Sequence, residues 1–219
     1  MKRTAILFDM DGLMVDTEPL ARRAWERTVA LYGASIDDDL YNQTIGRRTV
    51  ETTQLVLDAL RLPVAHADLM RRKTDEYMNI LAGGVPVMPG LWTLLDRIDA
   101  AGLPWAVATS TPRPVAEIVL GMLGVTERYH ALACGDEVTN GKPAPDIFLL
   151  AASRLGALPA ACLALEDSPA GCTAAAAAGM RVAAVPTDMT RSEAFPCAYR
   201  CYPSLAEVAA DLEQLLAAD

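Results

Sequence analysis

The chain has 219 residues, with 28 acidic side chains against 19 lysines and arginines, and a formal charge of −9. Hydrophobic residues make up 52% of it, which excludes a disordered chain and allows a core without disulfide or metal staples. The acidic balance argues against a nucleic-acid partner. Apolar runs such as Ala174–Ala178 are far shorter than the ~20 residues that span a membrane, so no membrane partner is expected.

The N-terminal part of the chain predicts one buried strand followed by a block of helices. The strand is Ala5–Phe8, and the block runs from about residue 16 to residue 83 without a convincing strand. The predicted helices of the block are Pro19–Tyr32, Asp38–Gln43, Thr49–Leu60 and Ala67–Leu81. We therefore predict an inserted all-α cap domain at residues 16–83, with a core made of residues 1–15 and 84–219.

The rest of the chain alternates short apolar runs with amphipathic stretches, a pattern typical of βαβ units. The further predicted strands are Trp105–Thr109, Ala131–Cys134, Cys162–Glu166 and Arg181–Val185. The predicted helices are Leu91–Ala101, Val115–Leu123, Ile147–Leu155 and Ser168–Ala178. A glycine follows each helical stretch, where a left-handed helix end favours this residue. The fold class that we predict is α/β, with a Rossmann-like parallel sheet as the core.

The N-terminus and the cysteines bear on the cellular compartment. The apolar run Ala5–Phe8 is too short for the core of a signal peptide, and Asp9 ends it. The five cysteines show no spacing typical of a zinc site, so we expect reduced and mostly buried thiols. Both features favour a cytoplasmic protein.

Two carboxylates stand directly after the first predicted strand. Asp9 and Asp11 are two residues apart, so their side chains project to the same side of an extended chain. Ligands of parallel α/β sheets bind at the carboxyl ends of the strands. Two like charges are costly to bury together unless a cation or a proton separates them. The alternative is a strand-to-helix turn in which both aspartates are solvated.

Three further features favour a site over that alternative. Thr109, Ser110 and Thr111 follow the second strand and offer hydroxyl and backbone N–H groups that suit a phosphoryl group, although such turns are common. Lys142 lies between turn residues, where an ordinary lysine would be a solvated surface charge. Glu166 and Asp167 end another strand, where either could also stabilise the start of a helix.

In this order, the four features resemble the motifs of the haloacid dehalogenase-like hydrolase superfamily. The resemblance covers the whole chain, including the helical block between the first two motifs. Within the superfamily the chain is similar to the branch that holds β-phosphoglucomutase and phosphatases of small sugar and nucleotide phosphates. This resemblance implies a phosphatase that releases phosphate from a small phosphorylated metabolite, a sugar or nucleoside phosphate. We expect it to act as a monomer.

The resemblance also implies a mechanism. Asp9 would attack phosphorus to form an aspartyl-phosphate, and Asp11 would protonate the leaving oxygen and later take a proton from the attacking water. Thr109 and the N–H of Ser110 would hold phosphoryl oxygens, and Lys142 would offset their charge.

Mg²⁺ is the cofactor that this mechanism implies, because it prefers oxygen ligands and keeps some of its waters. Its ligands would be a carboxylate oxygen of Asp9, the backbone carbonyl of Asp11, and Asp167. Glu166 would bind the metal or one of its waters.

Residues of the predicted cap should select the leaving group. By resemblance, the turn that carries Arg47 and the position of Lys73 contact the substrate in related enzymes. We interpret the neighbouring Arg48, and Arg71 and Arg72, as solvated helix charges.

Two alternatives to a phosphatase stay open. A mutase of the β-phosphoglucomutase type is one, but the mutase pattern has a histidine where this chain has Ala21 and an arginine where it has Thr49. A non-catalytic binding module with clustered aspartates is the other, but such a module would need neither the helical block nor Asp11.

Overall fold

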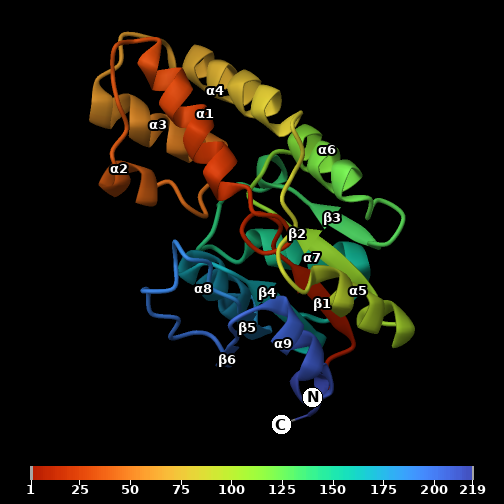
Figure 1. Cartoon of the computed structure of the whole chain (residues 1–219). Coiled ribbons are helices and arrows are strands. Elements are labelled where there is room, and N and C mark those ends of the chain that lie inside the picture. The colour runs from red at the N-terminus through yellow and green to blue at the C-terminus, as the bar shows by residue number, and fades with distance from the viewer. Residues whose placement is uncertain (1, 219) are drawn as a thin grey trace.

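A parallel sheet lies at the centre of the computed structural model, which describes residues 2–218 (Figure 1). The strands are β1 (Ala5–Phe8), β2 (Trp105–Ala108), β3 (Ala131–Ala133), β4 (Cys162–Glu166), β5 (Arg181–Ala184) and β6 (Arg200–Cys201). Their order is β3-β2-β1-β4-β5-β6, and every neighbouring pair is parallel. The predicted α/β fold is therefore confirmed.

Helices cover both faces of this sheet because alternate strand side chains point to opposite sides. Ile6 and Phe8 of β1 belong to a core shared with α5 (Leu91–Ala100), α6 (Arg113–Leu123), α9 (Leu205–Ala210) and α10 (Leu212–Leu216). Ala5 and Leu7 belong to a second core shared with α7 (Asp146–Leu155) and α8 (Pro169–Ala177). The central strand β1 is thus buried on both sides, which explains its purely apolar sequence.

Four helices between β1 and β2 form a separate layer that we call the helical insertion. They are α1 (Glu18–Ala30), α2 (Asp38–Asn42), α3 (Thr49–Leu60) and α4 (His66–Leu81). Their own apolar core contains Trp25, Tyr41 and Val56, and helices α1 and α4 run side by side above the sheet (Figure 1).

The two connections to the helical insertion meet in a narrow neck. Val15 forms an antiparallel bridge with Val87. The backbone N–H of Asp16 donates to the carbonyl of Pro86 at 2.8 Å, and the N–H of Met88 donates to the carbonyl of Met14 at 3.0 Å. The chain therefore enters and leaves the insertion through one pair of extended segments.

The structure differs from the sequence predictions mainly at the C-terminus. Strand β6, helices α9 and α10, and the short 3₁₀ segments η1 (Gly135–Glu137) and η2 (Pro159–Ala161) were not predicted. Strand β6 has two residues and both are exposed, so it carries no apolar pattern. Within residues 2–218, no helix has the length and apolar content needed to cross a membrane.

Candidate active site

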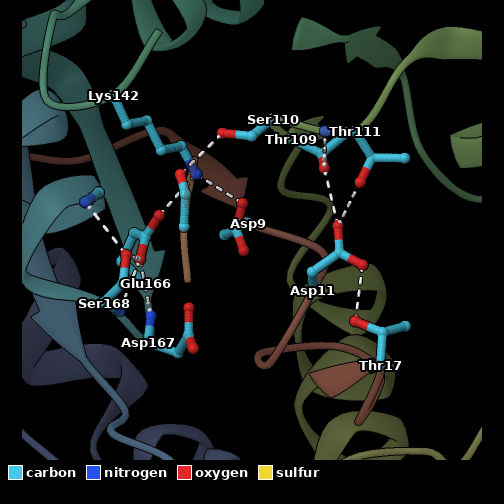
Figure 2. A network of polar contacts seen from close by, with 12 residues as sticks. Asp9, Asp11, Thr17, Thr109, Ser110, Thr111, Lys142, Glu166, Asp167 and Ser168 are labelled. Atoms are coloured by element: carbon cyan, nitrogen blue, oxygen red, sulfur yellow. Dashed lines mark hydrogen bonds and ion pairs between the residues drawn. The ribbon is translucent and has the colours of Figure 1, made fainter. Parts of the chain in front are cut away.

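Three carboxylates meet where β1 and β4 end side by side. Phe8 pairs with Leu165, so the residues that follow, Asp9 and Glu166, emerge at the same edge of the sheet. Asp9, Glu166 and Asp167 each offer an oxygen, and these oxygens all lie within 4.8 Å of one another (Figure 2). All three residues are buried. We call this group the acidic cluster.

Lys142 brings a positive charge into the acidic cluster. Its Nζ donates to Asp9 Oδ1 at 2.5 Å and to Glu166 Oε1 at 2.6 Å, and its side chain is only 2% exposed (Figure 2). Burial alone lowers the pKa of Lys142, but the attraction of Asp9 and Glu166 outweighs burial and raises this pKa above its usual value. The lysine is therefore a fixed ammonium ion and not a solvated surface charge.

The second oxygen of Glu166 is fully occupied by donors of the next segment. Its Oε2 accepts from the N–H of Asp167 at 2.9 Å, and from the N–H and Oγ of Ser168 at 2.8 and 2.9 Å. The Oγ of Ser168 also accepts from the N–H of Gly171 at 3.1 Å and so begins α8. A Cβ at position 171 would lie 1.7 Å from Glu166 Oε1, so this close approach requires glycine.

The electrostatics of the acidic cluster call for a further cation. Burial first, and then the charges of Glu166 and Asp11, raise the pKa of Asp9 to about 8 against the lowering effect of Lys142. Burial, followed by the charges of Glu166 and Asp9, also raises the pKa of Asp167 well above its usual value. One lysine therefore leaves excess negative charge among buried oxygens. This donor set fits a hard divalent cation such as Mg²⁺.

A glycine lets the first loop approach Asp167 closely. Gly12 has a φ of +79°, a conformation that side chains rarely adopt, and a Cβ there would lie 2.3 Å from Asp167 Oδ2. The Asp11-Gly12 turn therefore lies directly against the acidic cluster.

The Asp11 carboxylate, in contrast, points away from the acidic cluster (Figure 2). Its Oδ1 accepts from the Thr17 hydroxyl at 2.6 Å. Its Oδ2 accepts from the hydroxyls of Thr111 at 2.7 Å and Thr109 at 3.1 Å. Thr109 is fully buried. These hydrogen bonds tie Asp11 to the neck of the helical insertion and to the end of β2.

A pocket of about 110 Å³ opens between the acidic cluster and the helical insertion. Asp9, Asp11 and Lys142 line it from the sheet, and Arg47 and Lys73 line it from the insertion. The sequence-predicted residues from the two parts of the chain therefore face one space. Ser110 also lines it, and its Oγ donates to the carbonyl of Gly46 at 3.1 Å.

The two cations of the insertion have different surroundings. Lys73 lies over the rings of Tyr77 and Trp25, with its Nζ 4.6 and 5.9 Å from their centroids. Burial lowers the pKa of Lys73 to about 8, although Asp11 and Glu18 act in the opposite direction. The Arg47 side chain is exposed, and its guanidinium has no carboxylate partner anywhere in residues 2–218.

Several pocket residues were not predicted as functional. Thr17 and Thr111 hold Asp11, and Ser168 holds Glu166. Glu18 lines the pocket and accepts from the Tyr41 hydroxyl at 2.8 Å; burial raises the pKa of its carboxyl. The sequence carried signals for these residues: Thr17 and Glu18 stand at the start of the predicted cap domain, and Thr111 belongs to the hydroxyl-rich turn after the second predicted strand.

Comparisons with known proteins agree with this geometry. A family model described as haloacid dehalogenase-like hydrolase matches residues 4–179. Protein CbbY of Rhodobacter capsulatus is 37% identical over 219 residues, covering 95% of this chain and 96% of the relative. Fructose-1-phosphate phosphatase YqaB of Escherichia coli (strain K12) is 34% identical over 177 residues, covering 80% of this chain and 92% of the relative.

A solved structure shows the same similarity in three dimensions. The crystal structure of a mutant CbbY from Rhodobacter sphaeroides in complex with xylulose-(1,5)bisphosphate has a TM-score of 0.87 and 35% sequence identity. It covers 95% of this chain and 96% of the other, so the similarity includes the helical insertion.

Proposed function

Because this chain belongs to the haloacid dehalogenase-like hydrolase family, we propose that its acidic cluster hydrolyses the phosphate ester of a small sugar phosphate. The match to the family model confirms the resemblance that the sequence motifs indicated. The chain is an enzyme of the phosphatase class. The observation that carries the proposal is the buried Asp9–Lys142–Glu166 arrangement that lines the pocket.

The cofactor of the proposed reaction is Mg²⁺. The residues that would hold it are Asp9, Asp167 and the backbone carbonyl of Asp11, with Glu166 beside them. A bound divalent cation would reduce the repulsion between the acidic cluster and an anionic phosphoryl group. The raised pKa values of Asp9 and Asp167 support this assignment, because they reflect first the burial of these carboxyls and then the neighbouring negative charges, which Lys142 alone does not balance.

We propose Asp9 as the nucleophile. Its carboxylate oxygen forms a bond to phosphorus while the bond from phosphorus to the ester oxygen breaks. Lys142 donates to Asp9 Oδ1 at 2.5 Å. Lys142 holds this carboxylate in place and lowers the cost of bringing an anion beside it.

Asp11 serves as general acid and then as general base. It gives a proton to the departing alcohol oxygen. In the second half-reaction it takes a proton from the water that attacks phosphorus, while the bond from phosphorus to the Asp9 oxygen breaks and inorganic phosphate leaves. Its carboxylate must turn from Thr17 and Thr111 toward the pocket that it already lines. Thr109 and the backbone N–H of Ser110 hold the phosphoryl oxygens in this scheme.

The helical insertion, which we assign to residues 16–83, acts as a cap over the core formed by the rest of the chain. Arg47 and Lys73 bind the part of the substrate beyond the reacting phosphate. Both are cations without a carboxylate partner within residues 2–218, on an otherwise acidic protein. The ligand of the CbbY structure and the name of the YqaB relative support a phosphorylated sugar as the substrate.

Phosphate release from a panel of sugar and nucleoside phosphates, measured with Mg²⁺, tests this proposal. We expect turnover of at least one sugar phosphate, and loss of turnover in Asp9→Asn, which keeps the size of the side chain. Undiminished turnover in Asp9→Asn would refute the nucleophile. Isomerised sugar phosphate in place of free phosphate would indicate a mutase. No turnover by the native protein would indicate a binding module.

A further inference from the structure

We propose that Arg48 is a positioning residue that fastens the helical insertion to the loop that carries Lys142. Arg48 stands at the turn before α3, and its Nη1 donates to the backbone carbonyls of Val138 at 3.0 Å and Thr139 at 2.9 Å. The two carbonyls are 90 and 91 residues away along the chain. They belong to the core segment that leads directly to Lys142. The sequence predicted a solvated charge at this position, and the structure corrects that interpretation.

The guanidinium is pre-oriented for this contact. Its Nε donates to Glu51 Oε1 at 2.7 Å, and Glu51 lies in the first turn of the same helix. An ion pair three residues apart on a surface contributes little by itself. Its effect here is to fix the planar fork of Arg48 so that Nη1 faces the two carbonyls. The side chain of Arg48 is 18% exposed, and its hydrogen bond to the carbonyl of Val138 is partly buried.

The same turn of the insertion touches the core at two neighbouring points. The carbonyl of Gly46 accepts from Ser110 Oγ, and a Cβ at position 46 would lie 3.3 Å from Ser168 Oγ. Ser168 donates to Glu166 of the acidic cluster, and Ser110 lines the pocket. The turn at Gly46 therefore covers the pocket on the side of the insertion. Arg48 supplies the charged member of this set of contacts, and hydrogen bonds from charged donors are stronger than those between neutral groups.

The core loop is shaped to receive the arginine. A Cβ at Gly141 would lie 2.7 Å from Arg48 Nε and 3.0 Å from its Cδ, so a side chain at position 141 would displace the arginine. Position 141 precedes Lys142, whose Nζ holds Asp9 and Glu166. Docking of Arg48 therefore connects closure of the insertion to the position of the catalytic lysine. Closure of this kind excludes water and completes a reacting site.

This inference rests on the proposed phosphatase function, and its test has a readout that does not require turnover. The variants are Arg48→Ala, Arg48→Lys, Gly141→Ala and the double variant Arg48→Ala/Gly141→Ala. The matched control is Arg71→Ala, because Arg71 is an exposed arginine of the insertion that pairs within α4 with Asp68. Hydrogen exchange of the segments 44–48 and 136–141 is measured in the free protein. Turnover of p-nitrophenyl phosphate with Mg²⁺ is measured beside it.

In Arg48→Ala we expect exchange in both segments to rise about tenfold, and kcat to fall about tenfold with less than a threefold change in KM. We expect kcat to change more than KM because the core residues still bind the phosphoryl group, while the closed state of the insertion is less populated. Arg48→Lys recovers part of kcat, because one ammonium reaches a carbonyl without the planar fork. Arg71→Ala matches the native protein in both measurements.

The double variant tests whether Arg48 and Gly141 act through one shared contact or whether each substitution damages its own segment. Gly141→Ala displaces the arginine, so it should lower kcat in the native background and cost nothing further in Arg48→Ala. Additive losses would overturn the proposal, as would native exchange in Arg48→Ala. If the native protein hydrolyses no phosphate ester, the proposed function fails. The exchange data then still decide whether Arg48 holds the insertion on the core.

Discussion

Replacement of Lys142 by methionine tests whether this lysine holds the acidic cluster together. Methionine keeps the length of the side chain and removes its charge. Lys142 bonds Asp9 and Glu166 at 2.5 and 2.6 Å, and these three side chains are at most 7% exposed. Without the ammonium ion, the carboxylates have lost their only lysine or arginine partner within the described residues 2–218.

The expected loss is large because the pair is buried. Removal of one partner of a buried ion pair costs about 3–5 kcal/mol, since the other charge is left uncompensated. Asp9 and Asp167 can take up protons in response, as their raised pKa values show, so we expect a value near the lower limit, about 3 kcal/mol at pH 7. In a chain of this size that loss lowers the melting temperature by about 6–12 °C.

The assay is thermal and urea unfolding without metal and with MgCl₂. At about a hundredfold excess over its Kd, a ligand that binds only the folded state adds about 2.7 kcal/mol. We therefore expect Mg²⁺ to restore most of the stability of Lys142→Met. Turnover stays low, because the ammonium group of Lys142 that positions Asp9 is absent from this variant.

Lys73→Met is the matched control. Lys73 lines the same pocket, but burial lowers its pKa to about 8, which means that its charge is unfavourable in the folded protein at pH 7. This variant should be as stable as the native protein or more stable. The reasoning fails if Lys142→Met loses less than about 1 kcal/mol without metal, or if both lysine variants lose the same stability.

Three further outcomes follow from the site. Gly12→Ala places a Cβ against Asp167 at a positive φ, so it should cost about 1–3 kcal/mol and raise the Mg²⁺ concentration needed for half-maximal turnover, measured by metal titration. Ser168→Ala removes the cap of α8 and a donor to Glu166, and should lower the free energy of unfolding by about 1 kcal/mol in urea titration. Lys73 is cationic below its pKa of about 8, so kcat/KM for a sugar phosphate should fall as pH rises through that value, and this limb of the pH profile should vanish in Lys73→Met.

The sequence predicted the regular part of the fold well, for local reasons. Strands β1 and β4 and helix α3 have the predicted bounds, because apolar runs and polar helix starts mark their ends. The alternation of strands and helices made the carboxyl ends of the strands the place to look for a site. Asp9 and Glu166 do meet there, as the parallel sheet requires, and Lys142 reaches them from the loop before α7.

What the sequence could not predict depends on contacts between distant segments. The direction of the Asp11 carboxylate follows from hydroxyls at Thr17 and Thr111, which only the folded neck and β2 bring to it. The contacts of Arg48 lie about 90 residues away, and nothing in its own helix distinguishes it from a surface charge. The exposed strand β6 lacks an apolar pattern altogether.

The neck between Val15 and Val87 separates two properties of the enzyme. One continuous stretch of chain forms the whole helical insertion, and both of its ends lie side by side beyond the sheet. The pairing of β1 with β2 and β4 lies outside that stretch, and so do the carboxylates of the acidic cluster. Under the proposed function, preference for one leaving alcohol over another can be changed within this stretch, provided that the contacts of Thr17 and Arg48 with the reacting centre are kept.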